Sequence, residues 1–194
     1  MTVDNAKKQN ILIVHNYYQI PGGEDTVVAN EKKMLEKHCH KVILYSRNNA
    51  ELKQMSKLQK VFLPITTVFN PRTYRDIKKL IRDEKIEIVH VHNTLNLVSP
   101  AVYYAAMSHG LPVIAINHHG VGEIVTDETG VLIDPVSYES VKQGFLRAIE
   151  QYAQNPYLME KHGIAGRKRL ETHYSWENNA KVLQDIYGRI VAEK

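Results

Sequence analysis

Residues 86–93 read Ile-Glu-Ile-Val-His-Val-His-Asn, and this stretch decides the fold. Its Ile and Val residues come without strict polar alternation, which is typical of a strand buried on both faces of a parallel sheet. The polar residues His92 and Asn93 follow the apolar run directly. The same pattern predicts strands at Ile11–Val14, Val42–Tyr45, Ile86–Val91, Val113–Ile116 and Val131–Ile133, with Val61–Leu63 as a sixth candidate.

Amphipathic segments separate these runs, and several begin with a helix-capping residue. Ser99-Pro100, Ser137, Asn155-Pro156 and Ser175 are such starts. Apolar side chains at helical spacing follow two of them. After Ser137 they are Val141, Phe145, Ala148, Ile149 and Tyr152, and after Ser175 they are Trp176, Ala180, Leu183, Tyr187 and Ile190.

Strands that alternate with helices in this way predict an α/β fold. We expect a single doubly wound Rossmann-like domain over residues 1–194. Its sheet should be mostly parallel, with five to six strands and helices on both faces. The strand order should reverse beside the first strand.

Composition excludes several classes of protein. The chain has 194 residues, a formal net charge of +4 and 43% hydrophobic residues, which excludes disordered and collagen-like chains. The single cysteine, Cys39, excludes an internal disulfide framework and fits a reducing compartment. No apolar leader opens the sequence, and no apolar run approaches the roughly 18–20 residues of a membrane span. We therefore expect a cytoplasmic location.

The charge pattern gives no signature of nucleic-acid binding. The most basic stretch runs from Arg72 to Lys85. It fits the solvated face of a helix, or else a surface for anionic lipid headgroups and hence a peripheral membrane contact.

Ligands of open parallel sheets bind beyond the carboxyl ends of the strands, which directs attention to the loops there. The first of these loops contains Gly22, Gly23 and Glu24 before a predicted helix. Two glycines at that place allow backbone N–H groups to approach a phosphate or a sugar oxygen. A plain connecting loop explains them equally well, and the GxGxxG dinucleotide fingerprint is absent.

Histidines follow two of the strands. His90 and His92 face the same side of the sheet because strand side chains alternate. They are either structural residues or substrate contacts, since a metal site would need a third ligand from another loop, and we expect none. His118 follows the fourth strand and could orient a hydroxyl or act as a base. Glu123, in a short helix, either accepts hydrogen bonds from hydroxyls or caps the turn.

Three runs in the first part of the chain resemble a known family: ILIVHNYYQIPGGED, HKVILYSR and IEIVHVHNTLNLVSPAVYYAA. Through them residues 1–113 resemble the N-terminal domain of family 4 glycosyltransferases of the GT-B fold. Residues 105–194 resemble the end of the C-terminal domain of that family, through AAMSHGLPVIAINHHGVGEIVTDETGVLIDP and the segment after it. The resemblance implies that the final helix crosses back onto the front of the chain.

The resemblance implies transfer of a sugar from a nucleotide donor of the UDP type, without a cofactor or metal. Gly22, Gly23 and Glu24 would then approach the donor, and Glu123 would bind a donor hydroxyl. His92 and His118 would act as the catalytic residues that touch the transferring sugar or the acceptor.

Two features of the family are missing. The position that matches the second of its paired glutamates is Ala105, and the segment that supplies an Arg/Lys pair for the donor diphosphate is absent. The order of the segments fits either a natural minimal protein or a constructed chimera. Two functions remain: a glycosyltransferase that completes its site as a homodimer, and a non-catalytic scaffold that retains the fold without the donor site.

Overall fold

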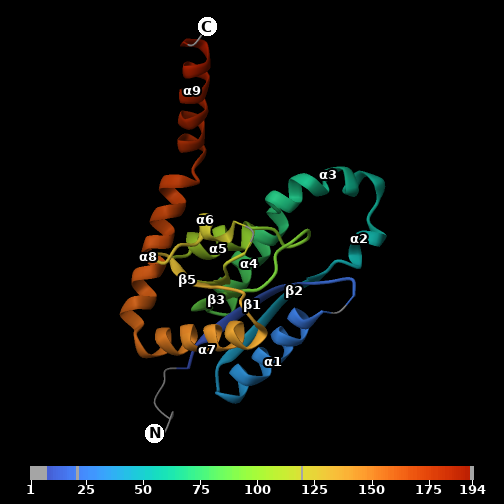
Figure 1. The fold of residues 1–194 in the computed structure, drawn as a ribbon, viewed down its shortest axis with the longest axis vertical. Helices are drawn as coiled ribbons and strands as arrows, with labels where there is room; N and C mark the ends of the chain where they lie inside the picture. Colours follow the sequence, from blue (N-terminus) through green and yellow to red (C-terminus); the bar gives the residue numbers. More distant parts are fainter. Residues whose placement is uncertain (1–7, 21, 119, 193–194) are drawn as a thin grey trace.

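The computed structural model describes residues 8–20, 22–118 and 120–192, built around one five-stranded sheet (Figure 1). The strand order is β2-β1-β3-β4-β5 and every pairing is parallel. Because β2 and β3 lie on opposite sides of β1, the order reverses beside the first strand, as predicted. The strands are β1 (Asn10–Tyr17), β2 (Lys41–Asn48), β3 (Ile88–Val91), β4 (Val113–Ile116) and β5 (Gly130–Ile133).

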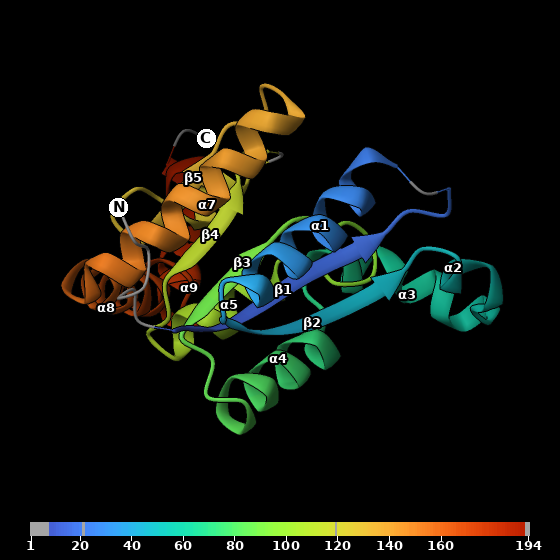
Figure 2. The same cartoon turned by 90° about the horizontal axis from the view of Figure 1, so that it is seen from below.

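Helices cover both faces of this sheet (Figure 2). One face carries α1 (Gly23–Lys37) and α7 (Tyr138–Gln154), and the other carries α4 (Pro71–Asp83) and α5 (Ala101–Ser108). This arrangement confirms the predicted Rossmann-like α/β fold. The remaining described helices are α2 (Glu51–Gln54), α3 (Lys57–Val68), α6 (Val121–Ile124), α8 (Pro156–His173) and α9 (Trp176–Ala192).

Side-chain caps start the helices close to the predicted positions. The Ser137 hydroxyl accepts a hydrogen bond from the Ser140 N–H, and the Asn155 side chain accepts one from the Leu158 N–H. Pro156 occupies the first turn of α8, where no N–H is needed. The helix predicted from Ser99-Pro100 begins one residue later, at Ala101.

Two apolar clusters hold the layers together. Leu12, Val14 and Val91 pack against α4 and α5, whereas Ile11 and Ile13 pack against α1 and α7. Adjacent residues of one strand therefore serve opposite cores, which explains why these strands show no polar alternation.

The sixth candidate strand is wrong. Val61–Leu63 lies inside α3, which begins with a capping box between Ser56 and Gln59. The Ser56 hydroxyl accepts from the Gln59 N–H, and the Gln59 side chain accepts from the Ser56 N–H. A short apolar run is ambiguous between strand and helix, and here the cap upstream decides for the helix.

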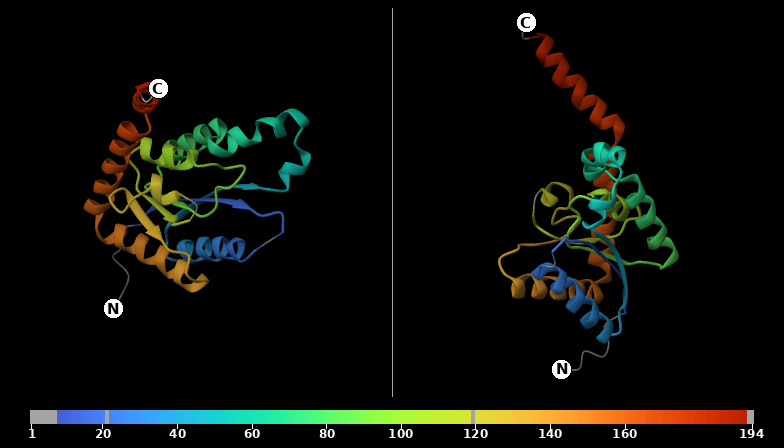
Figure 3. Two further views of the ribbon diagram at one scale, coloured as in Figure 1. Left: turned by 45° about the horizontal axis from the view of Figure 1, so that its top comes forward. Right: turned by 90° about the vertical axis from the view of Figure 1, so that its right-hand side faces the viewer.

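The final helix does not dock as expected. α9 stands away from the sheet beyond the end of α8 (Figures 1 and 3). Tyr187, predicted to lie on its buried face, is 64% exposed. The side chain of Trp176 lies outside the described residues. Among the helices of the described part, none is long and apolar enough to cross a membrane.

Candidate functional site

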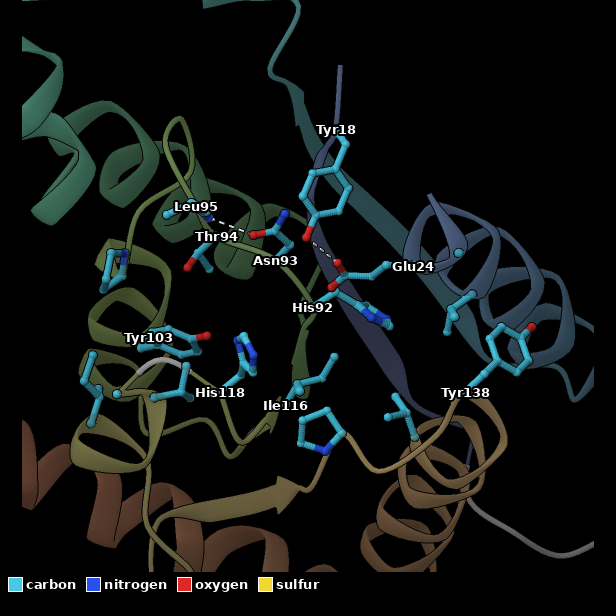
Figure 4. A pocket seen from close by; sticks show the side chains of 18 of the residues that line it. Tyr18, Glu24, His92, Asn93, Thr94, Leu95, Tyr103, Ile116, His118 and Tyr138 are labelled. Atoms are coloured by element: carbon cyan, nitrogen blue, oxygen red, sulfur yellow. Dashed lines mark hydrogen bonds between the residues drawn. The ribbon is translucent and has the colours of Figure 1, made fainter. Parts of the chain in front are cut away.

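A cavity of about 580 Å³ opens at the carboxyl ends of the strands (Figure 4). At this edge, between β1 and β3, the strand order of the sheet reverses. Such a reversal point is the usual position of the ligand in doubly wound folds. Its walls are formed by the loops that follow β1, β3, β4 and β5 and by the first turns of α1, α5 and α7. Its lining includes Tyr18, Gly23, Glu24, His92, Asn93, Thr94, Leu95, Tyr103, Ile116, His118, Gly120, Val121, Pro135 and Tyr138.

The first turn of α1 forms one wall. Gly23 and Glu24, two of the three residues expected to approach a ligand, line the cavity, whereas Gly22 is not among the lining residues. The Tyr18 hydroxyl donates to the Glu24 carboxylate at 2.9 Å. Burial, with the Glu24 carboxylate beside it, raises the pKa of Tyr18 to about 12. Tyr18 therefore stays protonated at neutral pH and holds the carboxylate at the cavity wall.

Asp25 closes the same turn on its inner side. One carboxylate oxygen lies 2.8 Å from His15 Nε2, and the other accepts from the Gly22 N–H at 3.0 Å. Burial lowers the pKa of His15, although the hydrogen bond to Asp25 opposes that shift. Because Asp25 already occupies the Gly22 N–H, this group is not free to bind a phosphate in the manner proposed from the sequence.

Behind the wall, His90 and His92 face the same side of the sheet, and their rings stack with centroids 4.4 Å apart. The His92 side chain is fully buried, and its Nε2 lies 2.7 Å from the Glu31 carboxylate of α1. His90 Nε2 lies 3.5 Å from the same oxygen. Burial holds the pKa of His90 well below its usual value, so the ring is neutral. The His92 imidazole is thus held beneath the floor of the cavity by a buried carboxylate.

This buried group has the composition of a metal site. Ligand atoms of Glu31, His90 and His92 all lie within 4.8 Å of one another. The third group comes from a helix, so the expectation that only another loop could supply it is wrong. Two ligands of one zinc ion, each about 2.0–2.2 Å from the metal, lie more than 3 Å apart in a tetrahedral site. The 2.7 Å separation of Glu31 and His92 is instead that of a charge-assisted hydrogen bond.

His118 forms part of the opposite wall. It is solvent-exposed, and its ring points into the cavity between Tyr103 and Ile116 (Figure 4). The structure therefore brings His118 to the same cavity as Glu24 and His92. Its position on a loop after β4 leaves it open to a ligand entering from solvent.

Glu123 lies outside this lining. It is exposed on α6, and its backbone carbonyl accepts from Arg169 Nη2 at 2.7 Å and from the Tyr174 hydroxyl at 2.6 Å. Arg169 Nε also donates to the Ile124 carbonyl. These bonds satisfy carbonyls at the end of α6 and tie the helix to α8, which fixes one rim of the cavity.

Asparagines fix another rim and were missed in the sequence. The Asn16 side chain donates to Asn49 Oδ1 at 2.9 Å and also to the Leu95 carbonyl. The Asn93 side chain donates to the Asn16 carbonyl at 3.0 Å. Bonds between the ends of β1, β2 and β3 hold the loop after β3 in place. The sequence did carry a signal for them, because Asn16 and Asn93 each come shortly after one of two predicted strands.

Glu31 was also missed, although the sequence carries a signal for it. It falls on the buried face of α1 together with Val27, Val28 and Leu35. A glutamate within an apolar helical stripe is rarely buried without a partner. The partners are the two histidines that the strand pattern had already placed on that side of the sheet.

Neither arginine nor lysine is among the residues that line the cavity in the described part of the chain. Its charged lining group is the Glu24 carboxylate, and neutral hydroxyl, amide and aromatic groups make up much of the rest. Such a surface suits the hydroxyls and apolar face of a sugar better than a diphosphate.

Comparisons with known proteins agree with the resemblance seen in the sequence. The sequence model for Glycosyltransferase Family 4 matches residues 21–157. YtcC of Bacillus subtilis, a protein named as a glycosyltransferase, is 34% identical over 94 residues, which is 48% of this chain and 22% of YtcC. Sucrose synthase of Solanum tuberosum is 32% identical over 102 residues, covering 47% of this chain and 13% of that enzyme.

Among solved structures, sucrose-phosphate synthase from Thermosynechococcus elongatus superposes with a TM-score of 0.52 at 16% identity. The superposition covers 96% of this chain and 46% of that enzyme. At this identity the likeness concerns the fold alone. The chain spans less than half the length of the proteins it resembles.

Proposed function

Because the chain belongs to glycosyltransferase family 4, we propose that its cavity binds a nucleotide sugar and serves transfer of the sugar from a UDP-type donor to an acceptor. The observation that carries this proposal is the cavity of about 580 Å³ at the carboxyl ends of the strands. Its volume is that of a pocket for a small molecule. Its position is the ligand position of doubly wound folds.

In this proposal the lining residues bind the neutral part of the substrates. Glu24 accepts from sugar hydroxyls, and Gly23 allows the backbone to approach them. His118 contacts the transferring sugar or the acceptor, where an imidazole can accept a hydroxyl proton. His92 contributes at the floor of the cavity, with its ring oriented by Glu31. The roles predicted for Gly22 and Glu123 would require a ligand that reaches beyond the cavity.

The diphosphate would need cations from elsewhere. A departing diphosphate is stabilised by positioned positive charges, and no lysine or arginine lines the cavity in the described part of the chain. A second copy of the chain, facing the cavity as the two domains of a GT-B protein face each other, is one source of such charges. The proposal therefore includes a homodimer.

The absence of lysine and arginine from the described lining favours a second candidate function, a non-catalytic scaffold. Without a cation, and with Glu24 and Asp25 in the first turn of α1, the cavity repels a diphosphate. The helix end offers only about half a positive charge against two carboxylates. In this alternative the fold is retained and the ligand is bound weakly or not at all.

Calorimetric titration of UDP into the protein and into Gly23→Val tests the proposal. We expect a weak Kd, on the order of 0.1–1 mM. A Cβ at Gly23 meets nothing within 4 Å, so the variant keeps the fold while its side chain occupies the cavity wall. Binding should weaken at least about fivefold, a loss of about 1 kcal/mol.

Gly188→Val is the matched control, since a Cβ at Gly188 of α9 also meets nothing within 4 Å. It should bind UDP like the parent. Equal affinity of the parent and Gly23→Val would place the ligand away from this wall and contradict the proposed site. Low-micromolar affinity of the parent would exclude the scaffold, whereas no binding up to several millimolar would favour it.

A further inference from the structure

Helix α3 presents its apolar side chains to solvent rather than to the protein. Leu58, Val61, Ile65 and Val68 are between 66% and 70% exposed, and Phe62 is 52% exposed. The opposite side of the helix is the one that meets the fold: Leu63, Thr66 and Thr67 are half-buried. The Thr67 hydroxyl, for example, donates to the Asn96 carbonyl at 3.3 Å. The usual distribution of an amphipathic surface helix is thus reversed.

The exposed residues form one continuous stripe. At 3.6 residues per turn, positions 58, 61, 62, 65 and 68 fall within an arc of roughly 120° on the helix surface. Phe69, just beyond the helix, is 40% exposed and instead packs its ring against Tyr74 and Tyr104. Scattered single apolar residues need no explanation, but a contiguous stripe of large ones marks an interaction surface. We refer to residues 58, 61, 62, 65 and 68 as the α3 stripe.

Within α3 and the residues just before it, the sequence carries positive charge without negative charge. Between Leu52 and Phe69 the sequence contains Lys53, Lys57 and Lys60 and no aspartate or glutamate, whereas Arg72 further along is paired with Asp76. Lys57 and Lys60 lie along one edge of the stripe, and both are exposed. The occupant that complements this surface is therefore apolar at its centre and anionic at its margin.

We propose that α3 binds an anionic lipid surface, lying in the plane of the interface with the α3 stripe in the boundary between headgroups and acyl chains. A helix that combines an apolar face with lysines at its edge binds membranes in this way, because the lysine stems extend along the apolar layer while their ammonium groups reach lipid phosphates. With 12 residues, α3 is about 18 Å long, which is too short to span a bilayer.

Two features favour a lipid surface over a protein partner. A protein interface of this charge would require a matched acidic surface, whereas a bilayer with anionic lipids supplies negative charge at any orientation of the helix. Helix α3 also extends away from the sheet at the periphery of the fold (Figure 3), so the whole helix can lie along a flat bilayer surface.

The surface adjoins the cavity. Thr67, on the inner side of α3, lines the cavity, and so does Leu95, which is 55% exposed. Binding of α3 to a membrane would therefore bring the cavity close to the lipid headgroups. Membrane binding itself does not depend on the function proposed for the cavity.

Co-sedimentation with vesicles tests the proposal directly. The intact chain should partition onto equimolar phosphatidylglycerol–phosphatidylcholine vesicles at least about tenfold more strongly than onto pure phosphatidylcholine. The double variant Val61→Ser/Ile65→Ser should lose at least about tenfold of that binding, because it removes apolar contacts from a surface that is already exposed. Lys57→Glu/Lys60→Glu should lose at least about fivefold on anionic vesicles and little on neutral ones.

The control is Tyr157→Ser/Ile164→Ser on α8, where the two side chains are 74% and 61% exposed. This variant removes a similar apolar area at a distant site and should bind vesicles like the parent, with circular dichroism to verify folding of all variants. Failure of the parent to bind anionic vesicles would overturn the proposal, as would equal loss in the control. A dimer by light scattering that Val61→Ser/Ile65→Ser converts to a monomer, without vesicle binding, would identify a second copy as the occupant instead.

Discussion

The two faces of the sheet differ in chemistry although the same strands supply both. Toward α4 and α5, Val89 and Val91 contribute only apolar side chains to the core. Toward α1 and α7, Ile88 is followed by His90 and His92, which lie over the Glu31 carboxylate. The first face is packed mainly from apolar side chains, with hydroxyl groups at Thr73 and Tyr103. The second changes from apolar to ionisable as it approaches the cavity.

This difference separates stability from function within one sheet. An apolar core responds to lost volume and not to pH. A buried carboxylate between two imidazoles responds to the loss of either partner and to protonation, because buried polar groups depend on their hydrogen bonds. Substitutions on the two faces should therefore change the free energy of unfolding by different amounts, and these changes should depend differently on pH.

The largest effect is expected on the apolar face. Ile77 of α4 is fully buried there. Ile77→Ala should lower the free energy of unfolding by about 2–5 kcal/mol, since it removes buried methylene groups and leaves a cavity. Urea denaturation at pH 7.5 and at pH 5.5 should give the same loss. A loss that changes by more than about 1 kcal/mol between these pH values would show that a titratable group is coupled to the packing around Ile77.

A smaller effect is expected from the carboxylate on the other face. Glu31→Leu leaves Nε2 of His92 without its hydrogen-bond partner and should cost about 1–3 kcal/mol. Glu31→Gln keeps an acceptor oxygen and should therefore lose less than half of the free energy of unfolding that Glu31→Leu loses. Glu36→Leu, at an exposed position of the same helix, is the control and should stay within about 0.5 kcal/mol of the parent. If Glu31→Leu costs no more than this control, Glu31 does not support the histidines.

The smallest effect is a pH dependence. Burial holds the pKa of His90 well below its usual value and lowers that of His15. Below about pH 6.5 the unfolded chain therefore binds protons that the folded chain does not, and stability falls as the pH falls. Each such group contributes up to about 1.4 kcal/mol per pH unit between pH 6.5 and 5.5.

Replacement of the buried imidazole sharpens this test. His90→Leu should show a shallower loss of stability over the same pH range, because one of the groups that takes up a proton on unfolding is gone. Glu31 and His92 face His90 and remain in the variant. Ile88→Val, on the same face, removes no titratable group and should keep the slope of the parent. Equal slopes in all three proteins would show that His90 is not held neutral by burial.

Much of the apolar architecture could be predicted because it follows from local rules. Runs of Ile and Val identified the five strands, and Ser137 and Asn155 marked the starts of two helices through their caps. The side to which His90 and His92 point followed from strand alternation. These features depend on the backbone conformation of a few neighbouring residues.

Features that depend on distant parts of the chain could not be predicted in the same way. The pairing of Glu31 with His92 joins residues 61 positions apart, and nothing local in either segment specifies it. The run at Val61–Leu63 has strand-like composition, and only the cap at Ser56 distinguishes it from a strand. The exposure of Tyr187 contradicts an apolar spacing that would normally indicate a buried face.

The projection of α9 also has a hydrodynamic consequence. Its 17 residues form a rod about 25 Å long beyond the end of α8. A monomer with such a rod has a higher frictional coefficient than a sphere of its mass, so it diffuses more slowly and elutes earlier from a sizing column. The 22.2 kDa chain would then appear heavier by elution volume than it is. Its stoichiometry should be determined by light scattering or sedimentation equilibrium, which weigh the particle regardless of shape.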